Sequence, residues 1–138
     1  MDLNNYTPTD LIKLYSQIIS KLKEKEIIRT KNIIGDLGEY LAIEHYNNTP
    51  GLPNLQAAPA GTQNIDAISR QGERYSIKST SGKLTGVFYG LNDQDSKEIE
   101  KQKFEYVIIV ILRDNFELHK IIEINWDNFL VIKNGIKP

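Results

Sequence analysis

A carboxylate and an ammonium group interrupt two short apolar segments near the middle of the chain. The stretch NIDAISRQGERYSIKSTSG, residues 64–82, carries Asp66 in its first segment and Ser76 and Lys78 in its second. A carboxylate can bind a divalent cation, and a lysine can offset the charge of a phosphate group. The alternative is a surface-exposed hairpin with an ordinary cross-strand ion pair, which contributes little to stability.

The turn between the two segments predicts how the strands align. Residues 70–72 form a favoured three-residue hairpin loop in which the glycine adopts the left-handed conformation. Asp66 then lies opposite Ser76, and Lys78 is its diagonal neighbour on the same face, at about 7–8 Å. A two-residue loop would instead place Asp66 opposite Ile77 and would mix the faces. The first register produces an apolar face made of Ile65, Ala67, Tyr75 and Ile77.

Two helices are predicted before this hairpin, and the first spans about residues 8–25. Thr7 suits the N-cap, Pro8 the first helical position, and Asp10 the first turn. Six apolar residues then recur at helical spacing and form a stripe that is either core or dimer surface. They are Leu11, Leu14, Tyr15, Ile18, Ile19 and Leu22.

The second helix is expected over about residues 31–46 and carries Glu39. Gly35 and Gly38 are unusual inside it, because each glycine costs about 1 kcal/mol relative to alanine. They are explained if another backbone, or a substrate, comes close to that face of the helix.

The order of the remaining elements predicts one α/β domain, residues 1–138, with a mixed central sheet flanked by helices and an extra N-terminal helix. A final helix is expected to begin at the cap Asn125, with Trp126 anchoring it in the core. The expected strands span residues 54–57, 65–69, 74–79, 104–112 and 116–124, and a short helix spans residues 96–103.

Composition limits the classes of function. The chain has 138 residues, and no apolar run approaches the roughly 20 residues that span a bilayer. It has no cysteine and only two histidines, so neither a thiolate site nor a histidine-rich zinc site is expected. The N-terminus lacks the pattern of a secretory signal, which predicts a cytoplasmic location.

The charge pattern gives no strong sign of nucleic-acid binding. The net charge is -1, although basic residues can still cluster on one face. A local basic segment is interpreted as a solvated helix face, because Glu24 and Glu26 are interleaved with it. Its members are Lys21, Lys23, Lys25, Arg29 and Lys31.

The hairpin and the helix before it resemble the PD-(D/E)XK nucleases, the restriction-endonuclease-like fold of type II restriction enzymes and Holliday-junction resolvases. In that family an acid begins one strand of a hairpin, and the next strand carries an acid, any residue and a lysine. A glutamate on the preceding helix often completes the site. Asp66 matches the first acid, Lys78 the lysine, and Glu39, in GDLGEYLA, the helical glutamate. The order of elements matches over about residues 31–124.

Two positions depart from the family pattern: Ile65 replaces a proline, and Ser76 replaces the second acid. In one branch of restriction enzymes the strand also reads serine-x-lysine, and an acid from the following helix takes over. Alternatively, Glu39 supplies the missing carboxylate, or the site has decayed and the domain only binds or scaffolds. The acids available in the following segment are Asp93, Asp95, Glu98 and Glu100.

The resemblance implies a metal-dependent endonuclease that hydrolyses phosphodiester bonds of DNA with Mg²⁺ or Mn²⁺. Asp66 and Glu39 would hold the cation through their carboxylate oxygens. Lys78 would orient or deprotonate the attacking water and offset charge on the phosphate. Ser76 could donate a hydrogen bond but would be a poor ligand.

The resemblance also implies partners. Small nucleases of this type usually cut both strands as dimers, so a homodimer through the first helix or the last strands is expected. The turn with Ser79, Thr80 and Lys83 either contacts backbone phosphates or is simply a polar turn. The competing hypotheses are a catalytically inactive domain that binds nucleic acid or a protein, and an unrelated α/β interaction module. The residues do not distinguish DNA from RNA.

Overall fold

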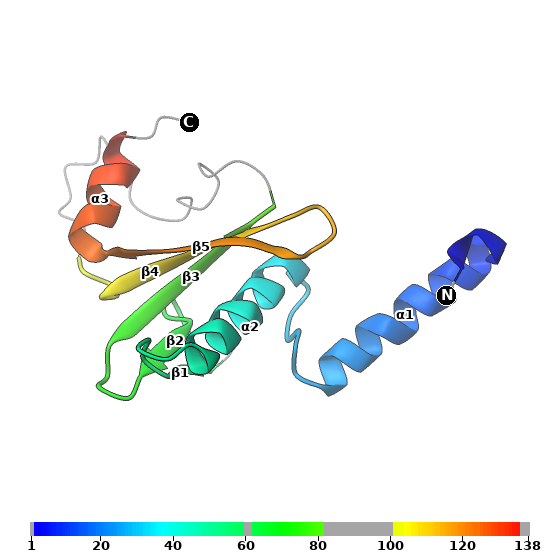
Figure 1. Ribbon diagram of the computed structural model, residues 1–138, viewed down its shortest axis with the longest axis horizontal. Coiled ribbons are helices and arrows are strands. Elements are labelled where there is room, and N and C mark those ends of the chain that lie inside the picture. The colour runs from blue at the N-terminus through cyan, green and yellow to red at the C-terminus, as the bar shows by residue number, and fades with distance from the viewer. Residues whose placement is uncertain (1, 60–61, 82–100, 136–138) are drawn as a thin grey trace.

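The strands of the described residues form one five-stranded mixed sheet in the order β1-β2-β3-β4-β5 (Figure 1). The computed structural model describes residues 2–59, 62–81 and 101–135. Neighbouring strands are antiparallel except β3 and β4, which are parallel. The predicted α/β class with a mixed central sheet is confirmed. The described strands are β1 (Leu55–Ala57), β2 (Ala67–Ser69), β3 (Arg74–Thr80), β4 (Tyr106–Leu112) and β5 (Leu118–Asn125).

Helices cover both faces of the sheet. α2 (Ile33–Asn48) lies across one face, and α3 (Trp126–Gly135) lies against one end of the other (Figure 1). Since both faces of β4 are covered, its continuous apolar run is buried almost throughout. Two cores result, and Trp126 anchors the second as predicted. The first includes Ala42, Tyr46, Tyr75, Ile77, Ile108 and Val110, and the second includes Phe104, Val107, Ile109, Trp126 and Phe129.

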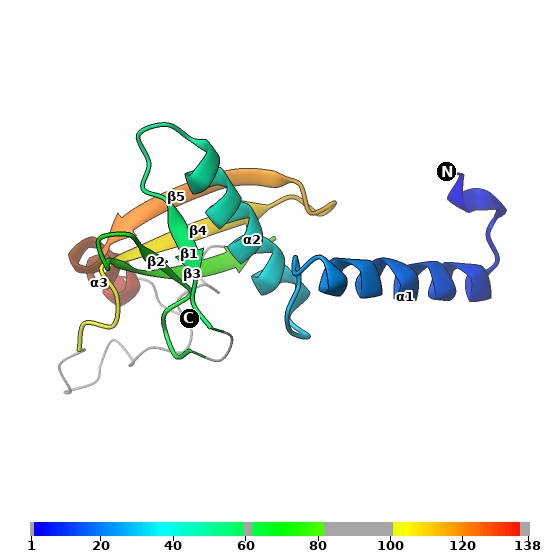
Figure 2. The same cartoon turned by 90° about the horizontal axis from the view of Figure 1, so that it is seen from below.

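The helix α1 (Pro8–Glu24) projects away from the sheet (Figure 1 and Figure 2). Its start is the predicted one, because Thr7 Oγ1 accepts from the amide of Asp10 and the Asp10 carboxylate accepts from the amide of Thr7. No residue of α1 is buried, so its apolar stripe is not part of this chain's described core. Whether a second copy covers the stripe stays a prediction.

None of the described helices is both long enough and apolar enough to cross a bilayer.

The two glycines of α2 have different neighbours. A Cβ atom at Gly38 would lie 1.7 Å from Oγ of Ser79, so α2 packs directly on β3 at this point. A Cβ atom at Gly35 would meet the side chain of Asn32, whose Oδ1 accepts from the Gly35 amide at 3.1 Å and caps the helix. A close neighbour of α2 is present at Gly38, but it is a side chain of the sheet and not the predicted backbone or substrate.

The hairpin of β2 and β3 has the predicted register. Ala67 pairs with Tyr75, and Gly72 has a φ of +86°, in the left-handed region that favours glycine. Continued by one residue, this register places Asp66 opposite Ser76. The three-residue loop and its glycine are confirmed.

β2 is shorter than the predicted strand over residues 65–69. Asn64 has a φ of +64°, and the regular pairing begins only at Ala67. Ahead of that point the Asp66 side chain, rather than a strand backbone, bonds the amide of Ile77. The regular strand therefore begins at Ala67, and Asp66 contacts β3 through both its amide, which donates to Tyr75, and its side chain.

The helix predicted over residues 96–103 is not present where the structure describes it. Residues 101–103 are not helical, and residues 96–100 lie outside the described ranges. The final helix is confirmed, because Asn125 Oδ1 accepts from the amide of Asn128 at 2.9 Å and caps α3 as predicted.

Candidate metal and active site

A pocket of about 60 Å³ lies where the segment before α2, the first turns of α2 and the start of β2 meet. It brings together Glu39 of α2 and Asp66, which precedes β2. Arg29, Thr30 and Asp36 line the same pocket. The two residues predicted as metal ligands are thus neighbours in the structure.

Asp66 is held on both its backbone and its side chain. Its amide donates to the carbonyl oxygen of Tyr75, and its own carbonyl oxygen accepts from the amide of Ala58, both at 2.8 Å. Its Oδ2 atom accepts from the amide of Ile77 at 2.7 Å. These contacts fix the carboxylate at the edge of β3, just beyond the last residue that pairs with β2.

Glu39 is in contact with both Asp66 and Arg29. A side-chain hydrogen bond joins the carboxyl groups of Glu39 and Asp66, and Arg29 Nη2 lies 3.1 Å from Glu39 Oε2. Burial, the charge of Asp66 and this hydrogen bond raise the pKa of Glu39 to about 7, against the lowering effect of Arg29. Below about pH 7 the Glu39 carboxyl group is therefore largely protonated.

Asp36 organises the segment that enters the site. It is only 7% exposed, and its Oδ2 accepts from the amides of Arg29 and Thr30 and from the Thr30 hydroxyl. Three donors thus occupy the same oxygen, so Asp36 holds the backbone before α2. Sequence reasoning missed Arg29, because the basic segment was interpreted as a solvated helix face. It also assigned no role to Asp36.

The donor set suits a hard divalent cation. Mg²⁺ and Mn²⁺ prefer carboxylate oxygens and are often held by one or two carboxylates with several waters retained. Glu39 and Asp66 supply such a pair, and a cation would compete with the proton on Glu39. Among residues 2–59, 62–81 and 101–135 there is no group of three acids or histidines able to hold a metal. The site therefore offers two protein ligands from the described residues.

Ser76 is buried on the face of β3 that points away from α2. It is 1% exposed, it faces the same way as its β4 neighbour Val107, and its hydroxyl makes no hydrogen bond within the described chain. Since Ile77 packs in the core under α2, alternation turns Ser76 to the opposite face of the sheet. The prediction of an open polar face on the hairpin is wrong at this residue, because a second core covers that face.

Lys78 leaves β3 on the same side as Ser76 and is half-buried. No ion pair joins it to Glu39 or Asp66 in the described part of the chain. The paired part of β2 ends opposite Tyr75, so the edge of β3 next to Asp66 is not covered by β2. Because the four-carbon side chain of lysine is flexible, the Lys78 ammonium group can extend past this edge of β3.

The residues predicted for phosphate contact lie at the end of β3 and beyond it. The Ser79 hydroxyl is buried against Gly38 and makes no hydrogen bond within the described chain. To contact a phosphate, the Ser79 hydroxyl would have to leave the contact between α2 and β3. Thr80 is half-buried at the end of β3. The third phosphate candidate, Lys83, lies outside the described residues. So do the acids considered as replacements for the second carboxylate: Asp93, Asp95, Glu98 and Glu100.

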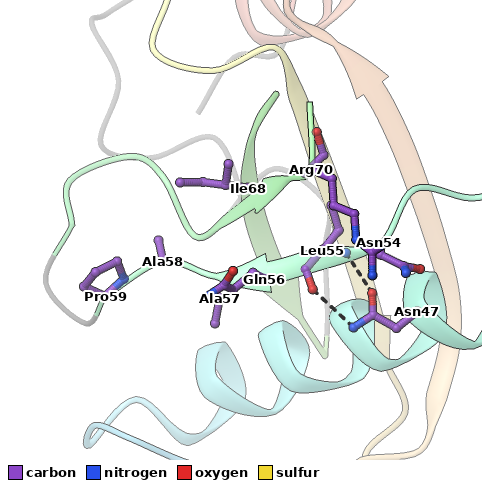
Figure 3. A pocket seen from close by; sticks show the side chains of 10 residues that line it. Asn47, Asn54, Leu55, Gln56, Ala57, Ala58, Pro59, Ile68 and Arg70 are labelled. Atoms are coloured by element: carbon purple, nitrogen blue, oxygen red, sulfur yellow. Dashed lines mark hydrogen bonds between the residues drawn. The ribbon is translucent and has the colours of Figure 1, made fainter. Parts of the chain in front are cut away.

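Two larger hollows adjoin the small pocket. One, of about 530 Å³, lies over β1 and β2 and shares Ala58 and Pro59 with it (Figure 3). Asn47 closes one side by bonding both the amide and the carbonyl oxygen of Leu55 (Figure 3). The polar residues that line this hollow are Asn47, Asn54, Gln56, Ser69 and Arg70.

The second hollow, of about 430 Å³, runs along α2 and shares Arg29, Asp36 and Glu39 with the small pocket. Glu26 and Glu44 add further acidic groups to its lining. The two hollows therefore differ in charge: the one over β1 and β2 carries an arginine and amides, whereas the one along α2 is acidic.

No protein-family model matches the sequence, and no curated protein matches it significantly.

Proposed function

We propose that the protein is a metal-dependent endonuclease of the PD-(D/E)XK type that hydrolyses phosphodiester bonds of DNA in restriction or repair. The observation that carries the proposal is the contact between the carboxyl groups of Glu39 and Asp66. One comes from a helix and the other from the start of a hairpin, as the resemblance requires. A bare ion pair on the hairpin would not explain why a second carboxylate lies against the first.

The proposed roles follow from how each group is held. Asp66 is the fixed ligand, because the amide of Ile77 immobilises one of its oxygens. Glu39 would be the second ligand and would release its proton on holding a cation. A bound Mg²⁺ would polarise the phosphate and lower the pKa of an attacking water. Lys78 would offset the charge that builds up on the phosphate, a role that rests on the resemblance.

The hollows suggest how DNA reaches the site. A phosphate backbone is repelled by the acidic hollow along α2, whose lining holds four carboxyl groups and Arg29. The hollow over β1 and β2 carries Arg70 and several amides, which can contact phosphate and bases. We therefore place the substrate on the side of β1 and β2.

The second candidate function is a catalytically inactive domain of the same architecture that binds nucleic acid or a protein. The observation that favours it is Ser76, which stands where the family has an acid and is buried on the other face. With two carboxylates only, such a domain could keep weak cation binding without cleavage.

The test is a cleavage assay on plasmid and single-stranded DNA with Mg²⁺ or Mn²⁺. The wild type should nick DNA in a metal-dependent way, and Asp66→Asn should reduce the rate by about a thousandfold or more. This variant keeps an oxygen for the amide of Ile77, so its fold is expected to survive. Lys78→Ala should also abolish cleavage.

Two results would contradict the proposed nuclease. One is equal activity in wild type and Asp66→Asn, which would point to a contaminating enzyme. The other is the absence of cleavage by the wild type on every substrate and with both metals. Cation binding without cleavage would then support the inactive domain.

A further inference from the structure

Arg29 is a cation that already contacts the carboxyl pair. Its Nη2 atom lies 3.1 Å from Oε2 of Glu39, and its Nη1 atom donates to the carbonyl oxygen of Ala58 at 3.2 Å. The amide of Ala58 in turn donates to the carbonyl oxygen of Asp66 at 2.8 Å. The guanidinium group therefore bridges the helix that carries Glu39 and the segment beside Asp66.

The backbone of Arg29 is fixed, whereas the end of its side chain is exposed. Asp36 accepts from the Arg29 amide at 2.7 Å and also holds the next residue, Thr30. The Arg29 side chain nevertheless keeps 32% of its surface exposed. A side chain anchored in this way can change partners without moving the chain to which it belongs.

A divalent cation at Glu39 and Asp66 would compete with this guanidinium. Two positive charges within a few ångströms repel each other strongly when they are shielded from water. The same guanidinium is suited to a phosphate, because its planar fork matches two phosphate oxygens. Cation binding would thus release Arg29 at the place where the phosphate of a substrate arrives.

We propose that Arg29 is the counterion of the Glu39–Asp66 pair in the metal-free protein and contacts the substrate phosphate in the loaded one. The inference rests on the proposed function for its second half, since the phosphate belongs to a nuclease substrate. Its first half concerns the cation site alone. The two halves can therefore be tested separately.

The first test measures Mn²⁺ binding without substrate at about pH 8. Calorimetry compares the wild type with Arg29→Met, which keeps an apolar stem but removes the charge. Loss of the counterion should tighten Mn²⁺ binding about tenfold. The matched control is Arg113→Met, since Arg113 is exposed at the turn after β4, and it should leave the affinity within about twofold.

Arg29→Lys separates a charge effect from a disturbed fold. Lysine keeps the charge, so its Mn²⁺ affinity should return to within about threefold of the wild type. In the second test, cleavage is measured at saturating Mn²⁺. Arg29→Met should then cleave at least about tenfold more slowly although it binds the cation more tightly.

The outcomes separate the counterion role of Arg29 from its phosphate role. Unchanged or weaker Mn²⁺ binding by Arg29→Met, relative to Arg113→Met, would overturn the counterion role even if the wild type is a nuclease. Tighter binding with a wild-type cleavage rate would overturn the phosphate role alone. Tighter binding in a protein that cleaves nothing would support the counterion role and refute the proposed nuclease. No Mn²⁺ binding by any variant would overturn both.

Discussion

Successive residues of β3 point to opposite faces of the sheet, and the two faces differ in their chemistry. The face under α2 adjoins the contact between Glu39 and Asp66, and Gly38 lets the helix lie directly on Ser79. The other face buries Ser76, without a hydrogen bond in the described chain, beside an apolar core. The hairpin alone therefore does not make the site: the second carboxylate is positioned by the helix that packs on it.

The largest effect on stability is expected at the contact between helix and strand. Gly38→Ala would place a Cβ atom 1.7 Å from Oγ and 2.6 Å from Cβ of Ser79, and neither atom is the end of a long side chain. The variant should lower the free energy of unfolding by about 2 kcal/mol, because overpacking outweighs the better helix propensity of alanine. Urea denaturation measures this change.

The matched control for this prediction is Gly35→Ala on the same helix. The atoms nearest to its Cβ atom would be those of the Asn32 side chain, so the expected loss is that of a helix cap, about 1 kcal/mol. Equal losses at the two glycines would show that α2 does not depend on its approach to β3.

The next effect concerns the pH dependence of stability. The pKa of Glu39 is raised from 4.5 to about 7, so the folded protein holds this proton more tightly than the unfolded chain does. The contribution is fully present below about pH 4.5 and is lost as the pH rises through about 7. After a discount for solvent screening, it amounts to about 1–2 kcal/mol.

Glu39→Gln tests this sign, because glutamine cannot titrate. The difference in unfolding free energy between wild type and variant should change by that amount between pH 4.5 and pH 8, with the wild type losing stability as the pH rises. A constant difference over this range would mean that the pKa of Glu39 is not raised in the folded protein.

The smallest effect is expected on the face away from α2. Ser76 buries a hydroxyl group without a partner in the described chain, so Ser76→Ala should raise the free energy of unfolding by up to about 1 kcal/mol. Ser79→Ala is the matched variant on the opposite face and should behave alike. A loss of stability in Ser76→Ala would mean that the Ser76 hydroxyl has a hydrogen-bond partner. The cleavage rate of the same variant decides whether Ser76 acts in the reaction.

Local signals were enough to predict the hairpin. The loop with Gly72 fixed the register, and the apolar alternation around Tyr75 assigned one face to the core. The capping residue Thr7 and the helix that it begins were predicted for the same reason: a short motif determines each. Glu39 was found because the resemblance directs attention to a glutamate on the helix before the hairpin.

Long-range packing could not be predicted in the same way. The cleanest apolar stripe in the sequence belongs to α1, yet no residue of that helix is buried. The burial of Ser76 depends on α3 and β4, which lie far away in the sequence. Arg29 and Asp36 were missed because their roles depend on a turn of the backbone before α2, which brings a basic segment back onto an acidic site.

The most direct test of the central claim is calorimetric titration of the protein with Mn²⁺ at about pH 6.5, in two buffers of different ionisation enthalpy. Glu39 is then largely protonated, since its pKa is about 7. Binding of one cation per chain should release a proton, up to about one per cation, and the release should disappear in Glu39→Gln together with most of the affinity. Binding without proton release, or equal affinity in Glu39→Gln, would contradict a cation site formed by Glu39 and Asp66.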